Sequence, residues 1–298
     1  IMKKYYFLGI GGTAMGSVAV AVGETGATVT GADEHVYAPM SDYLEQSGIR
    51  YYDGYDPAHI EHEQPDVIVV GNAVSRGNVE LEYALDKRME LMSMPDVVRQ
   101  LLIARHTSIV VAGTHGKTTT TSLVAWLLEV GDKRPGFMIG GIAQNFGRGC
   151  RAVPASVRNT EEGIFVTEGD EYDTAFFDKR SKFLLFRPDI AIVNNIEFDH
   201  ADIFASLEDI RRTFTLFVRL VPRSGLILVA YDEPDARSVA ERGLAPIETF
   251  GLVPEALWHA TDITTESGES RFTLFRERTE SGRFKMPLVG EHNVKNAV

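Results

Sequence analysis

A glycine-rich segment that also carries a lysine and several threonines is typical of a loop that binds the phosphates of a nucleotide. It reads Gly-Thr-His-Gly-Lys-Thr-Thr over residues 113–119, between the apolar runs 108–112 and 123–130. In such a loop backbone N–H groups hold a β-phosphate, a lysine neutralises the transferred phosphoryl group and a hydroxyl reaches Mg²⁺. These last two roles fall to Lys117 and Thr118. The remaining loop residues are predicted to bind the nucleotide: Gly113, Thr114, His115, Gly116 and Thr119.

This phosphate loop is a variant of the usual pattern. The pattern has a glycine five residues before Gly116, where this sequence has Val111. The competing interpretation is a helix that starts with Gly-Lys-Thr and binds no ligand. Two glycines and the position between a strand and a helix favour phosphate binding.

Acidic and imidazole side chains follow two other predicted strands. Glu168 comes directly after the strand 164–167, and His200 closes the segment that follows the strand 190–193. Ligands of open α/β sheets bind at the carboxyl ends of strands, and Mg²⁺ prefers oxygen ligands beside a phosphate. We therefore expect Glu168 and His200 in a functional site. Residues without this context are expected on the surface: His35, His59, His62, Glu171 and Asp209.

A second glycine loop lies near the start of the sequence. Gly9, Gly11 and Ala14 fit the dinucleotide fingerprint with its permitted terminal alanine, and Asp33 follows 24 residues after Gly9. Glycines allow a diphosphate to approach the backbone, and the N-terminus of the next helix attracts it. The loop alone does not distinguish NAD(P), FAD and a nucleotide sugar. It is also compatible with a tight turn that binds nothing.

Strand and helix patterns alternate around these loops, which predicts parallel βαβ units and an α/β fold. We expect a Rossmann-like domain at residues 1–105 and a P-loop-type domain at residues 106–298. The stretch 207–221 has helical apolar spacing, and 271–289 reads as an antiparallel hairpin with its turn at Ser281-Gly282. The predicted strands are 4–8, 27–31, 49–52, 66–71, 108–112, 163–167, 189–193 and 226–229. The predicted helices include 15–22, 41–46, 80–90 and 123–130.

The composition of the chain excludes several classes of function. The 298 residues carry 30 basic and 42 acidic side chains, a formal net charge of −12. Such a chain repels nucleic acid and anionic lipid, so we expect neither as a partner. Its apolar runs are far below the roughly 20 residues of a membrane span, and the single Cys150 makes no internal disulfide. A cytoplasmic protein is expected, and its oligomeric state is not predicted.

Together these residues resemble the Mur ligase family, ATP-dependent amide-bond ligases of peptidoglycan metabolism. The hallmarks are the loop 113–119, Glu168, the segment 195–200, and Gly290-x-His-Asn-x-x-Asn296. The resemblance implies that the protein uses ATP and Mg²⁺. It also implies that the first domain binds a UDP-sugar and not a nicotinamide dinucleotide. It also implies that the family's third domain lies outside this sequence, and that these residues alone are inactive.

Further segments resemble the branch of the family that uses UDP-N-acetylmuramate. They are 36–41, 71–78, 140–147 and 171–183, and Thr215 stands where several other members carry a carbamylated lysine. The resemblance implies that ATP activates the sugar carboxylate as an acyl phosphate. The amine of the murein tripeptide L-Ala-γ-D-Glu-meso-diaminopimelate then attacks it, in peptidoglycan recycling. Three alternatives stay open: a non-catalytic nucleotide-binding module, a UDP-N-acetylmuramate:L-alanine ligase and an NAD(P)-dependent oxidoreductase. The oxidoreductase leaves the phosphate loop unexplained.

The resemblance also implies site residues. Lys117, Glu168 and His200 are expected to be catalytic, and Thr118, Glu168 and His200 to hold Mg²⁺. The ATP base or ribose is expected near His292, Asn293 and Asn296. The uridine diphosphate is expected near Gly11, Gly12 and Asp33, with three candidates for the sugar: Asn145, Arg180 and Lys182.

Overall fold

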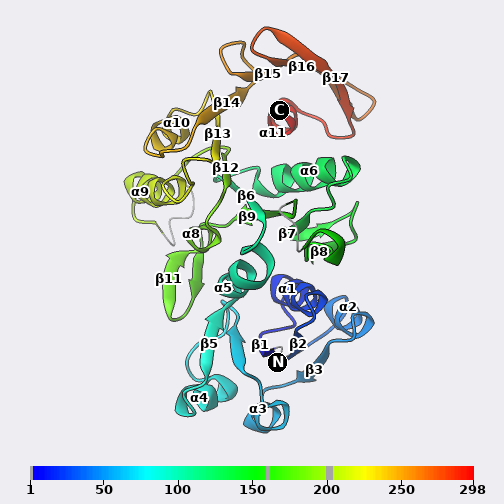
Figure 1. The fold of residues 1–298 in the computed structure, drawn as a ribbon, viewed down its shortest axis with the longest axis vertical. Helices are drawn as coiled ribbons and strands as arrows, with labels where there is room; N and C mark the ends of the chain where they lie inside the picture. Colours follow the sequence, from blue (N-terminus) through cyan, green and yellow to red (C-terminus); the bar gives the residue numbers. More distant parts are fainter. Residues whose placement is uncertain (1–2, 159–161, 199–203) are drawn as a thin grey trace. The chain divides into compact units, whose positions relative to one another are not determined.

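The computed structural model describes residues 3–158, 162–198 and 204–298 (Figure 1). The chain forms two compact units. The first contains residues 1–107, 128–166 and 171–186, and the second contains residues 108–127, 167–170 and 187–298. These units are groups of mutually packed residues, and the domain limits 1–105 and 106–298 stay predictions. The predicted mixed α/β class is confirmed.

A five-stranded parallel sheet forms the centre of the first unit. Its order is β3-β2-β1-β4-β5, with β1 at Lys4–Leu8, β2 at Thr28–Asp33, β3 at Arg50–Asp53, β4 at Val67–Val70 and β5 at Glu90–Ser93. Every residue of β4 is buried, as is β1 apart from Lys4. Continuous apolar strands of this kind are buried on both faces, because helices cover both sides of a parallel sheet. The glycine loop therefore follows a strand in the middle of the sheet.

Polar residues begin several helices of this unit. Asp56 caps α3 by accepting a hydrogen bond from the Ala58 amide, and Asn78 caps α4 by accepting from the amides of Glu80 and Leu81. Ser93 and Asp96 form a capping box at α5. The bounds are α1 Thr13–Glu24, α2 Met40–Gln46, α3 Pro57–Glu63, α4 Val79–Asp86 and α5 Met94–Val97, which a π-helix continues at Val98–Ile103.

Later segments of the chain complete the first unit. Strands β7 (Gly136–Ala143) and β8 (Arg148–Arg151) pair antiparallel, as do β10 (Asp173–Ala175) and β11 (Asp178–Ser181). Two short helices belong here, α7 (Ala155–Arg158) and α8 (Phe183–Phe186). Glu24 at the end of α1 binds this part through Arg148, with 2.6 Å between the guanidinium and the carboxylate.

The second unit is built on a mixed sheet. From its edge the order is β17-β16-β15-β14-β13-β12-β6-β9. Strands β6, β12, β13, β14 and β15 pair in parallel, and β15, β16 and β17 pair antiparallel. The bounds are β6 Thr107–Ala112, β9 Ile164–Gly169, β12 Ile190–Val193, β13 Leu226–Ala230, β14 Ile247–Gly251, β15 Trp258–Glu266, β16 Glu269–Arg276 and β17 Thr279–Met286.

The predicted hairpin forms, but its turn is not at Ser281-Gly282. The turn lies at residues 277–278, and Gly282 stands inside β17 with φ 152°. Leu274 is opposite Gly282 and Phe275 is opposite Glu280, so Ser281 is an extra residue in β17. A glycine inside a strand pattern marks a bulge as readily as a turn. Ser281 and Gly282 therefore mark a bulge, and the prediction that they form the turn was wrong.

Four helices belong wholly or largely to the second unit. They are α6 (Lys117–Val130), α9 (Leu207–Val218), α10 (Pro234–Ala240) and α11 (Glu291–Ala297). Helix α9 buries Ile210, Phe214, Phe217 and Val218, which confirms the apolar face. It ends three residues before the predicted Val221, because a residue that precedes a proline is disfavoured in helical conformation and Pro222 follows.

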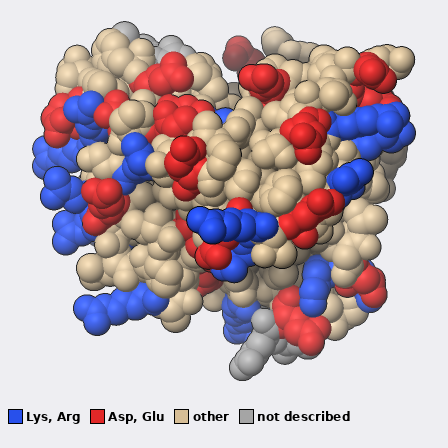
Figure 2. All heavy atoms as spheres, turned by 90° about the horizontal axis from the view of Figure 1, so that it is seen from above, with Lys and Arg blue, Asp and Glu red and all other residues tan. Residues whose placement is uncertain are grey.

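The surface carries charges of both signs. On the face drawn in Figure 2, Lys and Arg side chains are interspersed with Asp and Glu side chains. The net charge of −12 is therefore not gathered in one acidic field on this face. Within the described residues, no helix is long and apolar enough to span a membrane.

Candidate functional site

The loop 113–119 joins strand β6 to helix α6 in the second unit. Gly113 and Gly116 adopt φ values of 145° and 82°, which favour glycine. A Cβ atom on Gly116 would lie 2.8 Å from the amide oxygen of Asn296 and 3.0 Å from the amide nitrogen of Asn194. The loop therefore keeps its backbone close to two polar side chains, and only glycine fits at this point. Asn194 was not among the predicted site residues.

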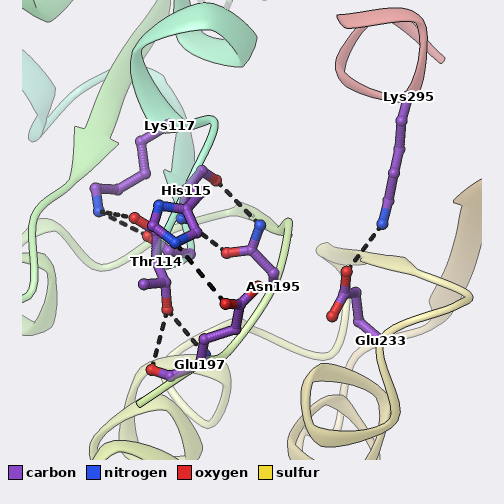
Figure 3. Close-up of polar contacts among 8 residues, drawn as sticks. Thr114, His115, Lys117, Asn195, Glu197, Glu233 and Lys295 are labelled. Carbon is purple, nitrogen blue, oxygen red and sulfur yellow. Dashed lines mark hydrogen bonds and ion pairs between the residues drawn. The ribbon is translucent and has the colours of Figure 1, made fainter. Parts of the chain in front are cut away.

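Residues after β12 hold this loop in place (Figure 3). The His115 amide donates to Asn195 Oδ1 at 2.8 Å, and Asn195 Nδ2 donates to the His115 carbonyl at 3.3 Å. The Glu197 amide donates to Thr114 Oγ1 at 2.9 Å, and that hydroxyl donates to the Glu197 carbonyl at 3.3 Å. The carbonyl ends of β6 and β12 are thus tied together by side chains, as expected for parallel neighbours.

Lys117 folds back over its own loop. Its Nζ donates to the carbonyl oxygens of Gly113 at 2.7 Å and Thr114 at 3.3 Å (Figure 3). The ammonium therefore lies within the loop whose N–H groups are predicted to hold phosphate. The role predicted for Lys117 stays a prediction.

Two of the three predicted metal ligands come together. Thr118 Oγ1 donates to Glu168 Oε2 at 3.2 Å, across the carboxyl ends of β6 and β9. A hydroxyl and a carboxylate at this separation provide the oxygen donors that Mg²⁺ prefers, so these residues fit the ion. His200, the third, lies outside the described residues. Among residues 3–158, 162–198 and 204–298, no group of three His, Cys, Asp or Glu side chains is arranged to hold a metal by protein ligands alone.

Helix α11 brings one predicted nucleotide residue to the phosphate loop. That residue is Asn296, which lies beside Gly116. Asn293 instead donates to the Val289 carbonyl at 2.8 Å, and the His292 ring lies against Gly290. Lys295, which was not predicted, pairs with Asp232 at 2.7 Å and with Glu233 at 3.0 Å. Figure 3 shows the pair with Glu233. These pairs attach α11 to the segment that follows β13.

The first unit has its own cavity at the glycine loop, of about 740 Å³. Gly9, Gly12, Asp33 and Tyr55 line it, together with residues 71–78. The Gly11 amide donates to Asp33 Oδ2 at 2.9 Å, and the Tyr55 hydroxyl donates to Asp33 Oδ1 at 3.3 Å. Burial raises the pKa of the Tyr55 hydroxyl, which therefore stays protonated and donates. The structure thus brings the predicted residues Gly12 and Asp33 to one cavity, and the Gly11 amide is hydrogen-bonded to Asp33.

The segment 71–78 forms one wall of this cavity. Arg76 makes two hydrogen bonds to Glu82, at 2.8 and 2.9 Å, and the Gly77 amide donates to the same carboxylate at 2.7 Å. The Arg76 hydrogen bond, followed by that of Gly77, lowers the pKa of Glu82 to about 2. The wall is thereby fastened to the first turn of α4. The segment 71–78 was expected to resemble the branch of the family that uses UDP-N-acetylmuramate, but none of its residues was predicted to belong to the site.

The three candidates for the sugar lie in the first unit as well. Asn145 is exposed in the turn between β7 and β8. Arg180 on β11 pairs with Asp178, which lowers the pKa of that carboxyl, and Lys182 follows β11. The β10–β11 hairpin reaches the cavity through Asp173, which accepts a hydrogen bond from Asn72. None of the three candidates lines the cavity, and their assignment stays a prediction.

A phosphate loop with an adjoining oxygen-ligand pair, and a glycine loop beside a cavity, are the features of an α/β protein with two candidate nucleotide-binding regions. The chain belongs to the Mur ligase family. Residues 111–298 match the family model of the Mur ligase middle domain, and residues 4–106 match that of the Mur ligase family catalytic domain.

Known relatives agree with this membership. The chain is 42% identical over 297 residues to the UDP-N-acetylmuramate--L-alanyl-gamma-D-glutamyl-meso-2,6-diaminoheptandioate ligase of Haemophilus influenzae, covering all of this chain and 63% of that protein. It is 30% identical to the UDP-N-acetylmuramate--L-alanine ligase of Clostridium acetobutylicum, covering 61% of that protein. The chain thus spans less than two thirds of the length of these relatives.

A solved structure is similar as well. The crystal structure of a UDP-N-acetylmuramate:L-alanyl-gamma-D-glutamyl-meso-diaminopimelate ligase from Neisseria meningitides is 41% identical, with a TM-score of 0.90. The match covers 99% of this chain and 91% of that one.

Proposed function

We propose that this chain supplies the UDP-sugar and ATP sites of a ligase that joins UDP-N-acetylmuramate to L-Ala-γ-D-Glu-meso-diaminopimelate, in peptidoglycan recycling. The observation that carries the proposal is the phosphate loop with Lys117 inside it and the Thr118–Glu168 pair beside it, at 3.2 Å. Identity of 42% to the Haemophilus influenzae ligase named for these substrates supports the choice of substrates. Activity requires the length of the relatives that this chain does not span, and a cytoplasmic location is part of the proposal.

The chemistry follows from the charges involved. A carboxylate and a triphosphate repel each other, so attack on the γ-phosphate needs positive charge where negative charge develops. Lys117 supplies it at the transferred phosphoryl group, and the N-terminus of α6 supplies N–H donors. The product of this step is an acyl phosphate, and the incoming alanine amine displaces its phosphate. Asn195 and Asn194 hold the loop while the charge moves.

Thr118 and Glu168, with His200 as a further ligand, are the residues that hold Mg²⁺ in this proposal. When bound, the ion neutralises phosphate charge and orients the oxygens of the nucleotide. The uridine diphosphate occupies the cavity lined by Gly9, Gly12 and Thr13, at the N-terminus of α1. Asn296 contacts the nucleotide beside Gly116.

Two experiments test the proposal. Isothermal titration of this chain with UDP-N-acetylmuramate is expected to give binding heat, whereas NADH and NADPH give none. The reverse result would replace the ligase with an oxidoreductase. Phosphate release by the full-length protein is expected to be faster with the tripeptide than with free L-alanine. Faster release with L-alanine would assign the chain to the L-alanine ligases, which are its relatives at 30–34% identity.

A further inference from the structure

A carboxylate buried in the first unit has no part in the chemistry above. Glu80, in the first turn of α4, has no exposed surface. His59 on α3 lies against it and exposes only 22% of its side chain, so the expectation that His59 is a surface residue was wrong. A buried charge is unfavourable unless it is paired and hydrogen-bonded, and its retention calls for an explanation.

One oxygen of Glu80 joins three segments of the unit. Oε1 accepts from the Tyr6 hydroxyl of β1 at 3.1 Å and from the Asp56 amide before α3 at 2.9 Å. His59 Nδ1 lies 2.8 Å from the same oxygen. The His59 ring also stacks on Tyr52, with ring centroids 4.0 Å apart, and Tyr52 donates to Glu63 at 2.5 Å. Strand, loop and two helices therefore meet at a single acceptor.

The segments joined in this way are walls of the glycine-loop cavity. Tyr55, which lines the cavity and binds Asp33, immediately precedes Asp56. Asn78, which also lines it, caps α4 by accepting from the Glu80 amide at 3.1 Å. The side chain of Glu80 thus holds one wall and its backbone holds the other. An apolar residue would fill the same space without joining them.

The second carboxylate oxygen of Glu80 makes no contact of this kind within the part of the chain that the structure describes. Oε2 is buried and has no hydrogen-bond partner among the described residues. A buried acceptor without a hydrogen-bond partner is unfavourable, so the carboxylate is held in place through the contacts of Oε1. The contacts of Glu80 join two walls of the cavity.

We propose that Glu80 is a positioning residue for the nucleotide cavity, through its contacts with Asp56 and His59 on one wall and the Asn78 turn on the other. This inference rests on the proposed function, because the ligand is the uridine nucleotide assigned there. Glu80 itself touches neither ligand nor reacting atoms. It acts by keeping Tyr55 and the segment 71–78 in the geometry that receives the ligand.

The test compares Glu80→Ala and Glu80→Gln with Ile60→Val in the 298-residue chain. Ile60 is a buried neighbour on α3 in the same hydrophobic core, so Ile60→Val loosens packing without removing the link. Affinity for UDP-N-acetylmuramate is measured by isothermal titration, well below the melting temperature of each variant. Hydrogen exchange by mass spectrometry is measured without ligand on peptides that contain residues 54–58 and 72–79.

We expect Glu80→Ala to bind at least tenfold more weakly and to exchange faster in both peptides. Glu80→Gln should fall between it and the wild type, because an amide oxygen still accepts from Asp56. Ile60→Val should bind within twofold of the wild type. Equal weakening by Ile60→Val and Glu80→Ala, or unchanged exchange in both peptides, would overturn the proposal. If the wild type gives no heat with UDP-N-acetylmuramate, the ligand assignment fails, and the exchange data still decide whether Glu80 joins the two walls.

Discussion

The side-chain amide of Asn195 forms two hydrogen bonds with the main chain of His115, accepting at 2.8 Å and donating at 3.3 Å. An asparagine that pairs with both backbone groups of one residue substitutes for a neighbouring strand. It continues the β6–β12 pairing past the end of the strands and holds the phosphate loop in the conformation that Gly113 and Gly116 require.

Asn195→Ala is expected to weaken nucleotide binding without unfolding the protein. Two hydrogen bonds of about 1 kcal/mol each are lost, so the KM for ATP should rise by roughly tenfold or more. Asn195→Asp keeps the acceptor for the His115 amide and should have a smaller effect. Steady-state phosphate release by the full-length protein measures both variants. An unchanged KM in Asn195→Ala would show that the loop does not depend on this pair.

Lys117→Ala is expected to lower turnover by about 10²- to 10³-fold, because the positive charge at the transferred phosphoryl group is lost. The matched control is Lys133→Ala, an exposed lysine just after the same helix. Phosphate release in the full-length protein is the measurement, with thermal unfolding to verify the fold. Turnover that is equal in the two variants would remove Lys117 from the reaction.

Glu168→Gln is expected to raise the Mg²⁺ concentration that gives half-maximal turnover, by roughly tenfold, because a charged oxygen ligand becomes neutral. Saturating Mg²⁺ should restore part of the rate. Glu255→Gln, an exposed acid of the same unit, should not change the requirement. The prediction fails if the dependence on Mg²⁺ is the same in Glu168→Gln and the wild type.

The stability of the protein should depend on pH through Glu80. Burial raises the pKa of this carboxyl above its ordinary value of about 4.3. The folded state then holds this proton more tightly than the unfolded state. The contribution of Glu80 is therefore most favourable below pH about 4 and declines as pH rises through the folded-state pKa.

Urea unfolding of the wild type and Glu80→Gln, from pH 4 to pH 8, measures this dependence. The wild type should lose free energy of unfolding relative to Glu80→Gln as pH rises. Glu82→Gln is the control, because the pKa of Glu82 is lowered to about 2 and its contribution to stability is therefore lost as pH falls, not as pH rises. A wild-type free energy of unfolding that stays constant, or rises, relative to that of Glu80→Gln as pH increases would contradict the assignment.

The two glycine loops and the regular strands of this protein could be predicted from its sequence. Phosphate loops combine glycines, a lysine and a hydroxyl in a few consecutive residues, so the segment 113–119 and the loop at Gly9–Ala14 are visible without coordinates. The predicted strands lie close to the observed ones. Two predicted helix bounds were wrong: the helix predicted at 123–130 begins at Lys117, and the helix predicted at 80–90 ends at Asp86, with Glu90 already in β5. The sequence pattern also placed Glu168 at a strand end, and Thr118 does reach it.

Tertiary structure alone decided which distant residues meet. Glu80, His59 and Tyr6 are far apart in the sequence and carry no pattern, yet they share one buried acceptor, and the same holds for Lys295 with Asp232. Ser281-Gly282 has the composition of a turn, and only strand pairing made it a bulge. Sequence patterns report short-range backbone preferences, whereas burial and long-range hydrogen bonds depend on how the sheets bring separate segments together.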